Sequence, residues 1–231
     1  GKLDVGGGHS IGESHNEVHG RVHIDQALSV SCNITFGALA MRLGGEKLAQ
    51  GFKRFGFEKN WTGETSSVNA ELPDWSKLDS GDIAQVGLGQ STLLVTPMHM
   101  ALLAEAIAGG GKVMKPYLVQ KIVSKEGVTL QERQPELWFE ATTKERAEKI
   151  DAWLENAVQK GTGTAAKVPG IRVTGKTGTA ENPGGEDHAW FIGSATLKNR
   201  RIALAVIVEN GGSGGKEAAP IAKQIILSLD K

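Results

Sequence analysis

The chain has 231 residues, 39% of them apolar, and its 26 Lys and Arg residues balance 26 Asp and Glu residues. The length suffices for one sizeable core or two small ones, no stretch is apolar enough to span a membrane, and the balanced charge argues against nucleic acid as the main partner. Cys32 is the only cysteine, which excludes an intrachain disulfide and a multi-cysteine metal site. We therefore expect a globular protein whose partner is small or peptide-like.

The N-terminal residues 1–23 are rich in glycine and histidine and lack a clear periodicity, so we expect a loop or a trimmed linker. Imidazole is a common ligand of first-row metals, and His15, His19 and His23 would line one face of a helix. A metal hypothesis therefore starts from five residues of this stretch: Glu13, His15, Glu17, His19 and His23. The H-E-x-x-H pattern is absent, however, and glycines flank the region. We expect no functional metal here.

The next part, residues 24–110, shows mainly helical patterns. Apolar residues recur at helical intervals in three segments: 25–43, 46–55 and 98–107. Gly44-Gly45 separates the first two, and Thr96-Pro97 supplies a cap and a first helical residue for the third. Residues 56–81 form a long irregular segment, and loops of that length usually serve function or cover a site.

The remaining part, residues 111–231, combines strand patterns with two helices. A strand pair over residues 112–130 would turn near Gly127, and Thr142 with Glu145 forms a capping box for a helix over residues 142–160. The apolar stripe of that helix indicates a core face. Three more strands and a closing helix are indicated around residues 171–174, 189–193, 202–208 and 216–229.

The segment Gly170–Thr179 satisfies two incompatible motifs. Residues 170–177 match the phosphate-binding pattern G-x-x-x-x-G-K-[ST], and residues 176–179 match the K-T-G motif of serine penicillin-recognising enzymes. A phosphate loop follows a buried strand and opens directly into a helix. Here a polar stretch precedes the motif, its interior is β-branched, and Gly178 leads into helix-breaking residues. We therefore expect a strand of a hairpin and reject a P-loop NTPase.

Two short motifs lie on the kinds of element that an acyl-transfer site needs. Ser31-Cys32-Asn33 forms S-x-N on a helical segment, and Lys176-Thr177-Gly178 forms K-[ST]-G on a strand. Between them lie the residues of a G-x-G-Q and a T-P-x-x-M-A stretch: Gly87, Gly89, Gln90, Thr96, Pro97, Met100 and Ala101. In this order the motifs resemble the transpeptidase domain of class B penicillin-binding proteins. The resemblance runs from about His19 to the C-terminus.

The resemblance implies an α/β (α+β) fold of the penicillin-binding protein transpeptidase and serine β-lactamase type. An antiparallel sheet would be flanked by helices, and an all-helical lobe would carry Ser31 and Asn33 across a cleft from Lys176. We expect residues 1–231 to form part of a single domain that is incomplete at its N-terminus. Its parts would be a loop or linker (1–23), a mainly helical lobe (24–110), and a sheet with two helices (111–231).

The implied chemistry is serine acyl transfer on a peptidoglycan stem peptide ending in D-Ala-D-Ala. Ser31 would relay a proton to the leaving nitrogen, Asn33 would bind the substrate amide, and Lys176 would hold positive charge near the nucleophile. The hydroxyls of Thr177 and Thr179 would bind the substrate carboxylate. Gly178 would let the peptide lie against the strand, and the Thr179 N–H would help to form an oxyanion hole. β-Lactams would acylate the same nucleophile.

The nucleophile motif S-x-x-K, which belongs upstream of S-x-N in this family, has no counterpart there in this sequence. Its only match is Ser213–Lys216, in a glycine-rich loop too flexible for a nucleophile, and we interpret it as a coincidence. We therefore expect the nucleophile to lie outside this chain, in a missing N-terminal part of the same domain, so that the chain alone would be inactive.

Three alternatives stay open from the sequence: a non-catalytic peptide- or partner-binding module on the same fold, a D,D-carboxypeptidase, and a β-lactamase. No cofactor and no nucleic acid are expected. The resemblance implies a position at the extracytoplasmic face of the bacterial plasma membrane, with an anchor outside this chain.

Overall fold

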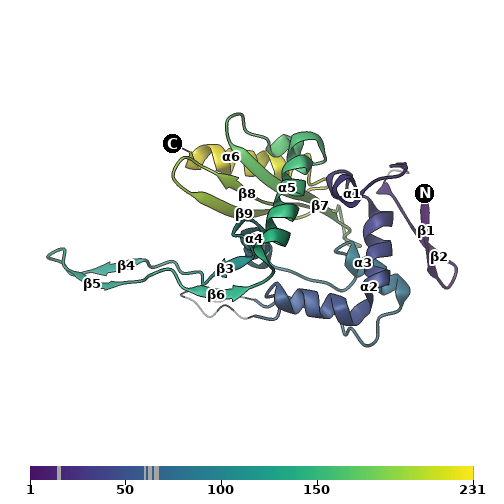
Figure 1. Ribbon diagram of the computed structural model, residues 1–231, viewed down its shortest axis with the longest axis horizontal. Helices are drawn as coiled ribbons and strands as arrows, with labels where there is room; N and C mark the ends of the chain where they lie inside the picture. Colours follow the sequence, from purple (N-terminus) through teal and green to yellow (C-terminus); the bar gives the residue numbers. More distant parts are fainter. Residues whose placement is uncertain (15–16, 60, 62–63, 65–67, 231) are drawn as a thin grey trace.

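The computed structural model describes residues 1–14, 17–59, 61, 64 and 68–230 of the chain. Its central element is an antiparallel sheet of three strands in the order β7–β8–β9 (Figure 1). The strands are β7 (Arg172–Ala180), β8 (His188–Thr196) and β9 (Arg201–Val208). In the register of β7 and β8, Lys176 lies opposite Ile192 and Gly178 opposite Trp190. All three strands were indicated by the sequence.

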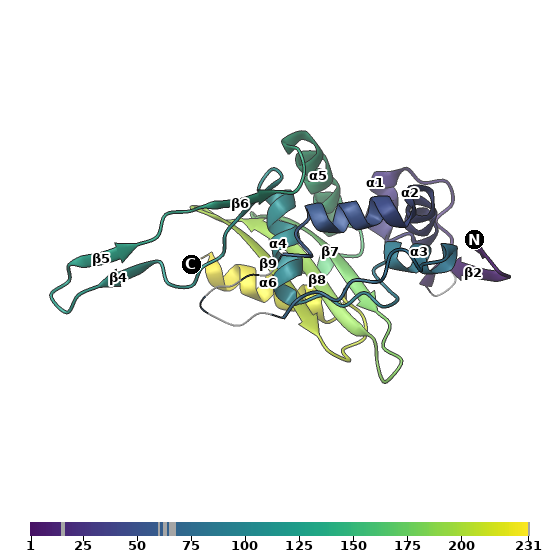
Figure 2. The same ribbon diagram turned by 90° about the horizontal axis from the view of Figure 1, so that it is seen from below.

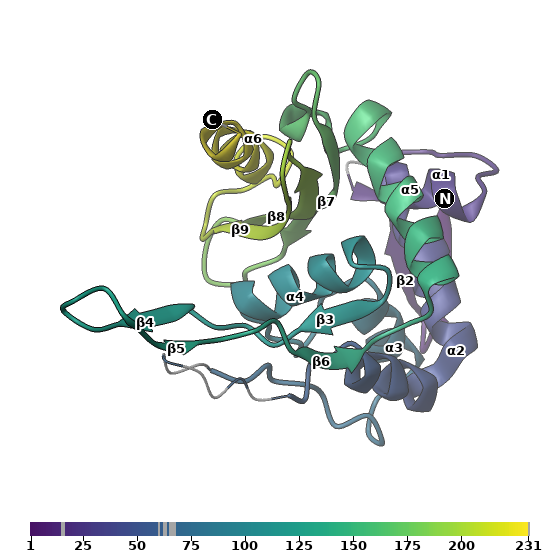
Figure 3. The same ribbon diagram turned by 60° about the vertical axis from the view of Figure 1, so that its left-hand side comes forward.

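Two helices cover opposite faces of this sheet, which lies between them in Figure 3. They are α6 (Ala218–Leu229) and α4 (Pro97–Ala108). Because side chains alternate along a strand, Phe191 points into the core under α6, where it is fully buried beside Ile226. Trp190 and Ile192 point to the other face, toward α4 and the groove described below. The Thr96 hydroxyl caps α4 by accepting from the His99 N–H at 3.2 Å, which confirms the predicted helix start.

A third helix, α5 (Lys144–Lys160), runs along the β7 side of the sheet. Its N-cap is Thr143, one residue later than the predicted capping box, and the Thr143 hydroxyl accepts from the Arg146 N–H at 3.4 Å. At the start of β7, the Arg172 guanidinium pairs with Asp151 at 2.7 Å and Glu155 at 2.8 Å on α5. A short 3-10 helix, η2 (Thr164–Ala166), then leads toward β7. These contacts fix the strand that carries the K-T-G motif.

Among the residues that the structure describes, the helical lobe contains three helices and a hairpin. The helices are α1 (Ile24–Val30), α2 (Asn33–Arg54) and α3 (Ser80–Gly87). Helix α2 is kinked at Gly44, whose φ of 76° no other residue type adopts easily, so the break expected at the glycine pair is present. Helix α3 packs on α2 where a side chain on Gly87 would collide with Ala40. The first glycine of G-x-G-Q therefore serves helix packing.

The N-terminal stretch is folded, whereas the sequence indicated a loop or linker over residues 1–23. Strands β1 (Lys2–Gly6) and β2 (His9–Gly12) form an antiparallel hairpin. The signal is the short alternation of Leu3, Val5 and Ile11, which pack with Ala84 of α3 in a small core. Glycine at positions 6 to 8 masked this pattern, although it is what the tight turn requires, because all three have positive φ.

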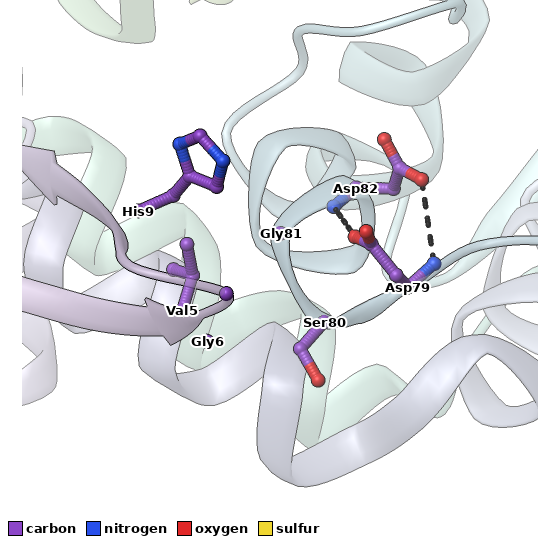
Figure 4. A pocket seen from close by; sticks show the side chains of 8 residues that line it. Val5, Gly6, His9, Asp79, Ser80, Gly81 and Asp82 are labelled. Atoms are coloured by element: carbon purple, nitrogen blue, oxygen red, sulfur yellow. Dashed lines mark hydrogen bonds between the residues drawn. The ribbon is translucent and has the colours of Figure 1, made fainter.

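A hollow of about 400 Å³ lies between the turn of this hairpin and the start of α3 (Figure 4). Asp79 and Asp82 cap α3 reciprocally at its rim, with Asp79 Oδ1 accepting from the Asp82 N–H at 2.8 Å. His9 stands on the opposite side of the hollow. The residues that line the hollow do not include any of the S-x-N or K-T-G motif residues.

The segment after α4 forms a ribbon that projects from the body (Figure 2). Four short strands build it: β3 (Lys112–Met114), β4 (Lys121–Val123), β5 (Thr129–Glu132) and β6 (Leu137–Glu140). The predicted turn at Gly127 is present between β4 and β5, but β3 pairs with β6, which the sequence did not indicate. The expected fold class, an antiparallel sheet with flanking helices and a helical lobe, is confirmed. Within the described residues, every helix is too short or too polar to cross a bilayer.

Candidate active site

The S-x-N and K-T-G motifs, 145 residues apart, meet across the cleft between the helical lobe and the sheet. The Lys176 ammonium donates to the Ser31 hydroxyl oxygen at 2.9 Å. Lys176 extends from the edge strand β7, and Ser31 occupies the turn between α1 and α2. This single contact confirms that the two motifs face each other.

Ser31 reaches Lys176 because its backbone is left-handed, with φ 60° and ψ 47°. The Ser31 and Cys32 N–H groups cap the end of α1 by donating to the carbonyls of Leu28 and Ala27 at 3.3 and 2.9 Å. This conformation is costly for a residue with a side chain, and glycine is the usual occupant. The presence of a serine in this strained conformation at the end of α1 indicates that its hydroxyl has a function.

The same turn is held from the side of α5. The Thr162 N–H donates to the Ser29 carbonyl at 3.1 Å, and a side chain on Gly161 would collide with that carbonyl. The Thr162 hydroxyl also lies 2.6 Å from the Thr177 hydroxyl and accepts from Lys176 Nζ at 3.5 Å. Thr162 therefore belongs to the site, and sequence reasoning missed it because it lies in the polar stretch that argued against a phosphate loop.

Asn33 starts α2, and its side chain is turned toward the N-terminal hairpin. The Asn33 Nδ2 donates to the Gly12 carbonyl at 3.1 Å, and its backbone N–H donates to Glu13 Oε2 at 2.8 Å. Burial raises the pKa of Glu13, but hydrogen bonds from Cys32 and from the Asn33 and Ile34 amides outweigh this effect and lower it. Asn33 thus lies beside Ser31 at the start of α2, as the motif predicts. Its side-chain amide, however, is hydrogen-bonded to the N-terminal hairpin and not to Lys176.

Desolvation lowers the pKa of Lys176 to about 8. Besides Ser31, its Nζ donates to the carbonyl of Thr177 at 2.8 Å. A lysine with a pKa of about 8 is protonated and neutral in comparable amounts at mildly basic pH, which suits proton exchange with a neighbouring hydroxyl. The pair of Ser31 and Lys176 can therefore act as a proton relay.

The K-T-G strand presents its outer backbone edge to the cleft. Gln90 binds that edge: its Nε2 donates to the Thr179 carbonyl at 3.3 Å, and its Oε1 accepts from the Glu181 N–H at 3.3 Å. Because the N–H and C=O of one strand residue point to the same edge, the Thr179 N–H also points away from β8. The final residue of G-x-G-Q thus aligns the strand, a role that the motif match alone did not reveal.

Gly178 is enclosed on both sides of the strand. A side chain there would approach Trp190 Cβ at 3.2 Å, and a side chain on Gly214 would collide with the carbonyl of Gly178. The Gly214 N–H donates to the Thr179 hydroxyl at 3.4 Å. The turn that contains the S-x-x-K match therefore packs against the strand through Gly214. Ser213 and Lys216 themselves are exposed, and neither shows a sign of being a nucleophile or its base.

An apolar groove of about 770 Å³ adjoins these residues. Its floor is the β7 edge from Lys176 to Ala180, and its walls come from α2, α4 and the end of α3. The apolar side chains that dominate it include Leu43, Leu48, Phe52, Phe55, Leu103 and Trp190. The groove joins the polar motif residues to a large surface suited to apolar contact.

The structure removes the phosphate-loop alternative. Gly170 has a positive φ of 78° and forms a turn, after which residues 172–180 are one continuous strand. A phosphate loop would open into a helix at Lys176, where its N–H groups could face an anion. The K-T-G reading of the segment is the one that the geometry supports.

Comparisons of sequence agree with the geometry. The family profile described as "Penicillin binding protein transpeptidase domain" matches residues 2–227. Over 216 residues the chain is 31% identical to the peptidoglycan D,D-transpeptidase PbpA of Mycolicibacterium smegmatis, an alignment covering 89% of this chain and 43% of the relative. It is 30% identical to the peptidoglycan D,D-transpeptidase MrdA of Haemophilus influenzae, covering 90% of this chain and 36% of the relative. The chain thus spans less than half the length of these relatives.

Comparisons of structure give the same family. A D,D-transpeptidase domain of a peptidoglycan glycosyltransferase from Eggerthella lenta superposes with a TM-score of 0.90 at 29% identity, covering 99% of this chain and 58% of that one. Penicillin-binding protein A of Mycobacterium tuberculosis, in an acyl-enzyme complex with imipenem, superposes with a TM-score of 0.90 at 26% identity, covering 100% of this chain and 54% of that one.

Proposed function

Because the chain belongs to the penicillin-binding protein transpeptidase family, we propose that it forms most of the active site of a peptidoglycan D,D-transpeptidase. The observation that carries the proposal is the 2.9 Å hydrogen bond from Lys176 Nζ to Ser31 Oγ beside an open groove. Relatives named D,D-transpeptidases support the reaction class. The substrate would be a stem peptide ending in D-Ala-D-Ala, and β-lactams would compete for the same site.

In the first half-reaction a serine hydroxyl attacks the carbonyl between the two D-alanines, an ester forms, and D-alanine leaves with a proton. The Ser31 hydroxyl, hydrogen-bonded to Lys176, would deliver that proton to the leaving nitrogen. In the second half-reaction an amine attacks the ester, the serine is released, and the same relay accepts the proton of the amine. The lowered pKa of Lys176, about 8, supports both directions of transfer.

The β7 edge would hold the peptide. An extended substrate would lie along this edge and face the outward N–H groups of Thr177 and Thr179, and the Thr179 N–H would stabilise the oxyanion. The hydroxyls of these threonines would bind the terminal carboxylate, with the charge of Lys176 nearby. Asn33 would bind the substrate amide, which requires its side chain to leave the Gly12 carbonyl on binding. Gly178 supports this arrangement because a larger residue would press on Trp190.

The nucleophile would come from a segment outside this chain that seats in the apolar groove beside Lys176. An amphipathic helix could place apolar residues against Leu48, Phe52 and Trp190 while its serine faced Lys176. The reaction would take place at the extracytoplasmic face of the plasma membrane, where such a substrate is found.

Covalent labelling by a fluorescent penicillin tests the proposal on the full-length protein that contains this chain. The unchanged protein should be labelled, and Lys176→Ala should lower the labelling rate by at least about 100-fold. Lys198→Ala, which removes an exposed lysine at the far end of the sheet, should label normally. Equal labelling of the two variants, or no labelling of the unchanged protein, would contradict the proposal.

A further inference from the structure

We propose that Thr162 is a positioning residue for carboxylate recognition: its hydroxyl donates to the Thr177 hydroxyl and leaves the hydrogen of Thr177 to point into the cleft. The two hydroxyl oxygens lie 2.6 Å apart, a short distance at which one of them donates to the other. The proposal rests on the proposed function, in which Thr177 binds the terminal carboxylate of the substrate. It adds the residue that decides whether Thr177 offers that carboxylate a hydrogen or a lone pair.

The charge of Lys176 sets the direction of this hydrogen bond. An ammonium group donates three hydrogen bonds and accepts none. Three oxygens lie around its nitrogen: the Thr177 carbonyl at 2.8 Å, the Ser31 hydroxyl at 2.9 Å and the Thr162 hydroxyl at 3.5 Å. Even at the longest of these distances, the positive charge attracts the lone pairs of the Thr162 oxygen and repels its hydrogen. Thr162 therefore turns its single hydrogen away from Lys176, toward the oxygen of Thr177.

This direction determines what Thr177 can bind. A hydroxyl has one hydrogen, and because the oxygen of Thr177 accepts from Thr162, that hydrogen remains available to a ligand in the cleft. An ionised carboxylate only accepts hydrogen bonds, whereas an amide at the same place also donates them. A Thr177 hydroxyl whose hydrogen faces the cleft therefore favours a free carboxylate over a blocked peptide end.

Thr179 has the same arrangement with a donor of fixed direction. The Gly214 backbone N–H donates to the Thr179 hydroxyl oxygen at 3.4 Å, so the exposed hydroxyl of Thr179 also keeps its hydrogen for a ligand. Thr177 and Thr179 are two positions apart on one strand, which places their side chains on the same side of it. Both hydroxyls thus receive a hydrogen from the protein and donate one outward. Two outward donors beside the charge of Lys176 suit the two oxygens of a carboxylate.

The backbone around Thr162 is fixed, as a positioning role requires. The Thr162 N–H donates to the Ser29 carbonyl at 3.1 Å, and the Gly163 N–H donates to the Ala157 carbonyl of α5 at 3.0 Å. On the other side, a side chain on Gly215 would lie 3.0 Å from the Thr162 carbonyl. These contacts hold the Thr162 hydroxyl beside Thr177 before any ligand arrives. Thr162 thus acts on the substrate through Thr177, without being a ligand-binding residue itself.

Acylation of the full-length protein by benzylpenicillin and by its methyl ester tests this role, because the ester has the same reactive ring without the free carboxylate. Thr162→Val removes the hydroxyl and should lower the second-order rate constant for benzylpenicillin about 5- to 20-fold. The rate constant for the ester should change by less than about twofold. Thr162→Ser keeps the hydroxyl and should stay within about threefold of the unchanged protein. The matched control is Thr164→Val, an exposed threonine two residues further on, which should react like the unchanged protein.

A double-mutant cycle shows whether Thr162 acts through Thr177. Thr177→Val alone should slow acylation by benzylpenicillin at least as much as Thr162→Val, and adding Thr162→Val to it should slow acylation further by less than about twofold. Three results would overturn the proposal: losses that multiply in the double variant, an unchanged benzylpenicillin rate in Thr162→Val, or equal losses for benzylpenicillin and its ester. Each of these leaves the proposed function intact. An unchanged protein that benzylpenicillin does not acylate would instead refute the proposed function itself.

Discussion

The side-chain amide of Gln90 bridges Thr179 and Glu181, so it binds the outer edge of β7 as a neighbouring strand would. Two hydrogen bonds of 3.3 Å from one side chain keep the Thr179 N–H directed to the cleft. The alignment of the strand that carries the K-T-G motif therefore depends on a residue 89 positions earlier in the chain.

Replacing Gln90 tests this dependence. Gln90→Ala removes both hydrogen bonds, so we expect a loss of about 1 to 2 kcal/mol in the free energy of unfolding. In the full-length protein the rate of β-lactam acylation should fall about tenfold, because the oxyanion donor of β7 is less well placed. Gln90→Glu keeps an oxygen that accepts from the Glu181 N–H, so its stability and acylation rate should lie between those of the unchanged protein and of Gln90→Ala. Gln120→Ala, an exposed glutamine on the ribbon, is the control; a similar loss there would argue against a specific role.

Two substitutions of Ser31 separate the effect of its backbone strain on stability from the effect of its hydroxyl on acylation. Ser31→Gly and Ser31→Ala both remove the hydroxyl that binds Lys176, so both should lower acylation of the full-length protein to the same degree. Only alanine keeps a side chain at φ 60°, so Ser31→Gly should be about 1 kcal/mol more stable than Ser31→Ala in urea unfolding. A glycine variant that acylates normally would exclude the hydroxyl from the relay.

The stability contribution of Lys176 should depend on pH. Burial lowers its pKa from 10.5 to about 8, so between pH 8 and 10.5 the unfolded chain binds a proton that the folded chain does not. The free energy of unfolding contributed by this group therefore rises with pH across that window, by at most about 3 kcal/mol.

Comparison with Lys176→Met isolates this contribution from the other titrating groups. We expect the unchanged chain to gain stability relative to Lys176→Met as the pH of urea unfolding rises from 7 to 10. Lys198→Met, which removes an exposed lysine, should show a constant difference from the unchanged chain. A constant difference for Lys176→Met as well would show that Lys176 keeps its usual pKa.

Gly214 should tolerate no side chain. A methyl group there would meet the carbonyls of Gly178 and Trp190, which are backbone atoms of the sheet and cannot move aside alone. We expect Gly214→Ala to destabilise the chain by about 1 to 3 kcal/mol in thermal or urea unfolding. Gly51→Ala in α2, where an added Cβ would meet no described atom outside its own stretch of helix within 4 Å, should instead stabilise the chain by about 0.5 to 1 kcal/mol. Equal effects of both changes would show that the contact at Gly178 is not close.

The sequence predicted what depends on local periodicity and on short motifs. Strands β8 and β9 and the Thr96 cap are examples, because strand composition and capping chemistry suffice for them. The opposition of Ser31 to Lys176 was expected only through the resemblance to a known family. It missed Thr162 and the N-terminal hairpin. Thr162 joins the site through the fold of α5 and η2, and the glycines of the hairpin conceal the alternation that pairs its strands.

The contact between Ser29 and Thr162 has a mechanical consequence. The turn after α1 is fixed to the end of α5 by the 3.1 Å hydrogen bond of these two residues, directly beside the 2.9 Å contact of Ser31 with Lys176. The end of α5 therefore sets where Ser31 stands relative to Lys176, although it carries neither residue.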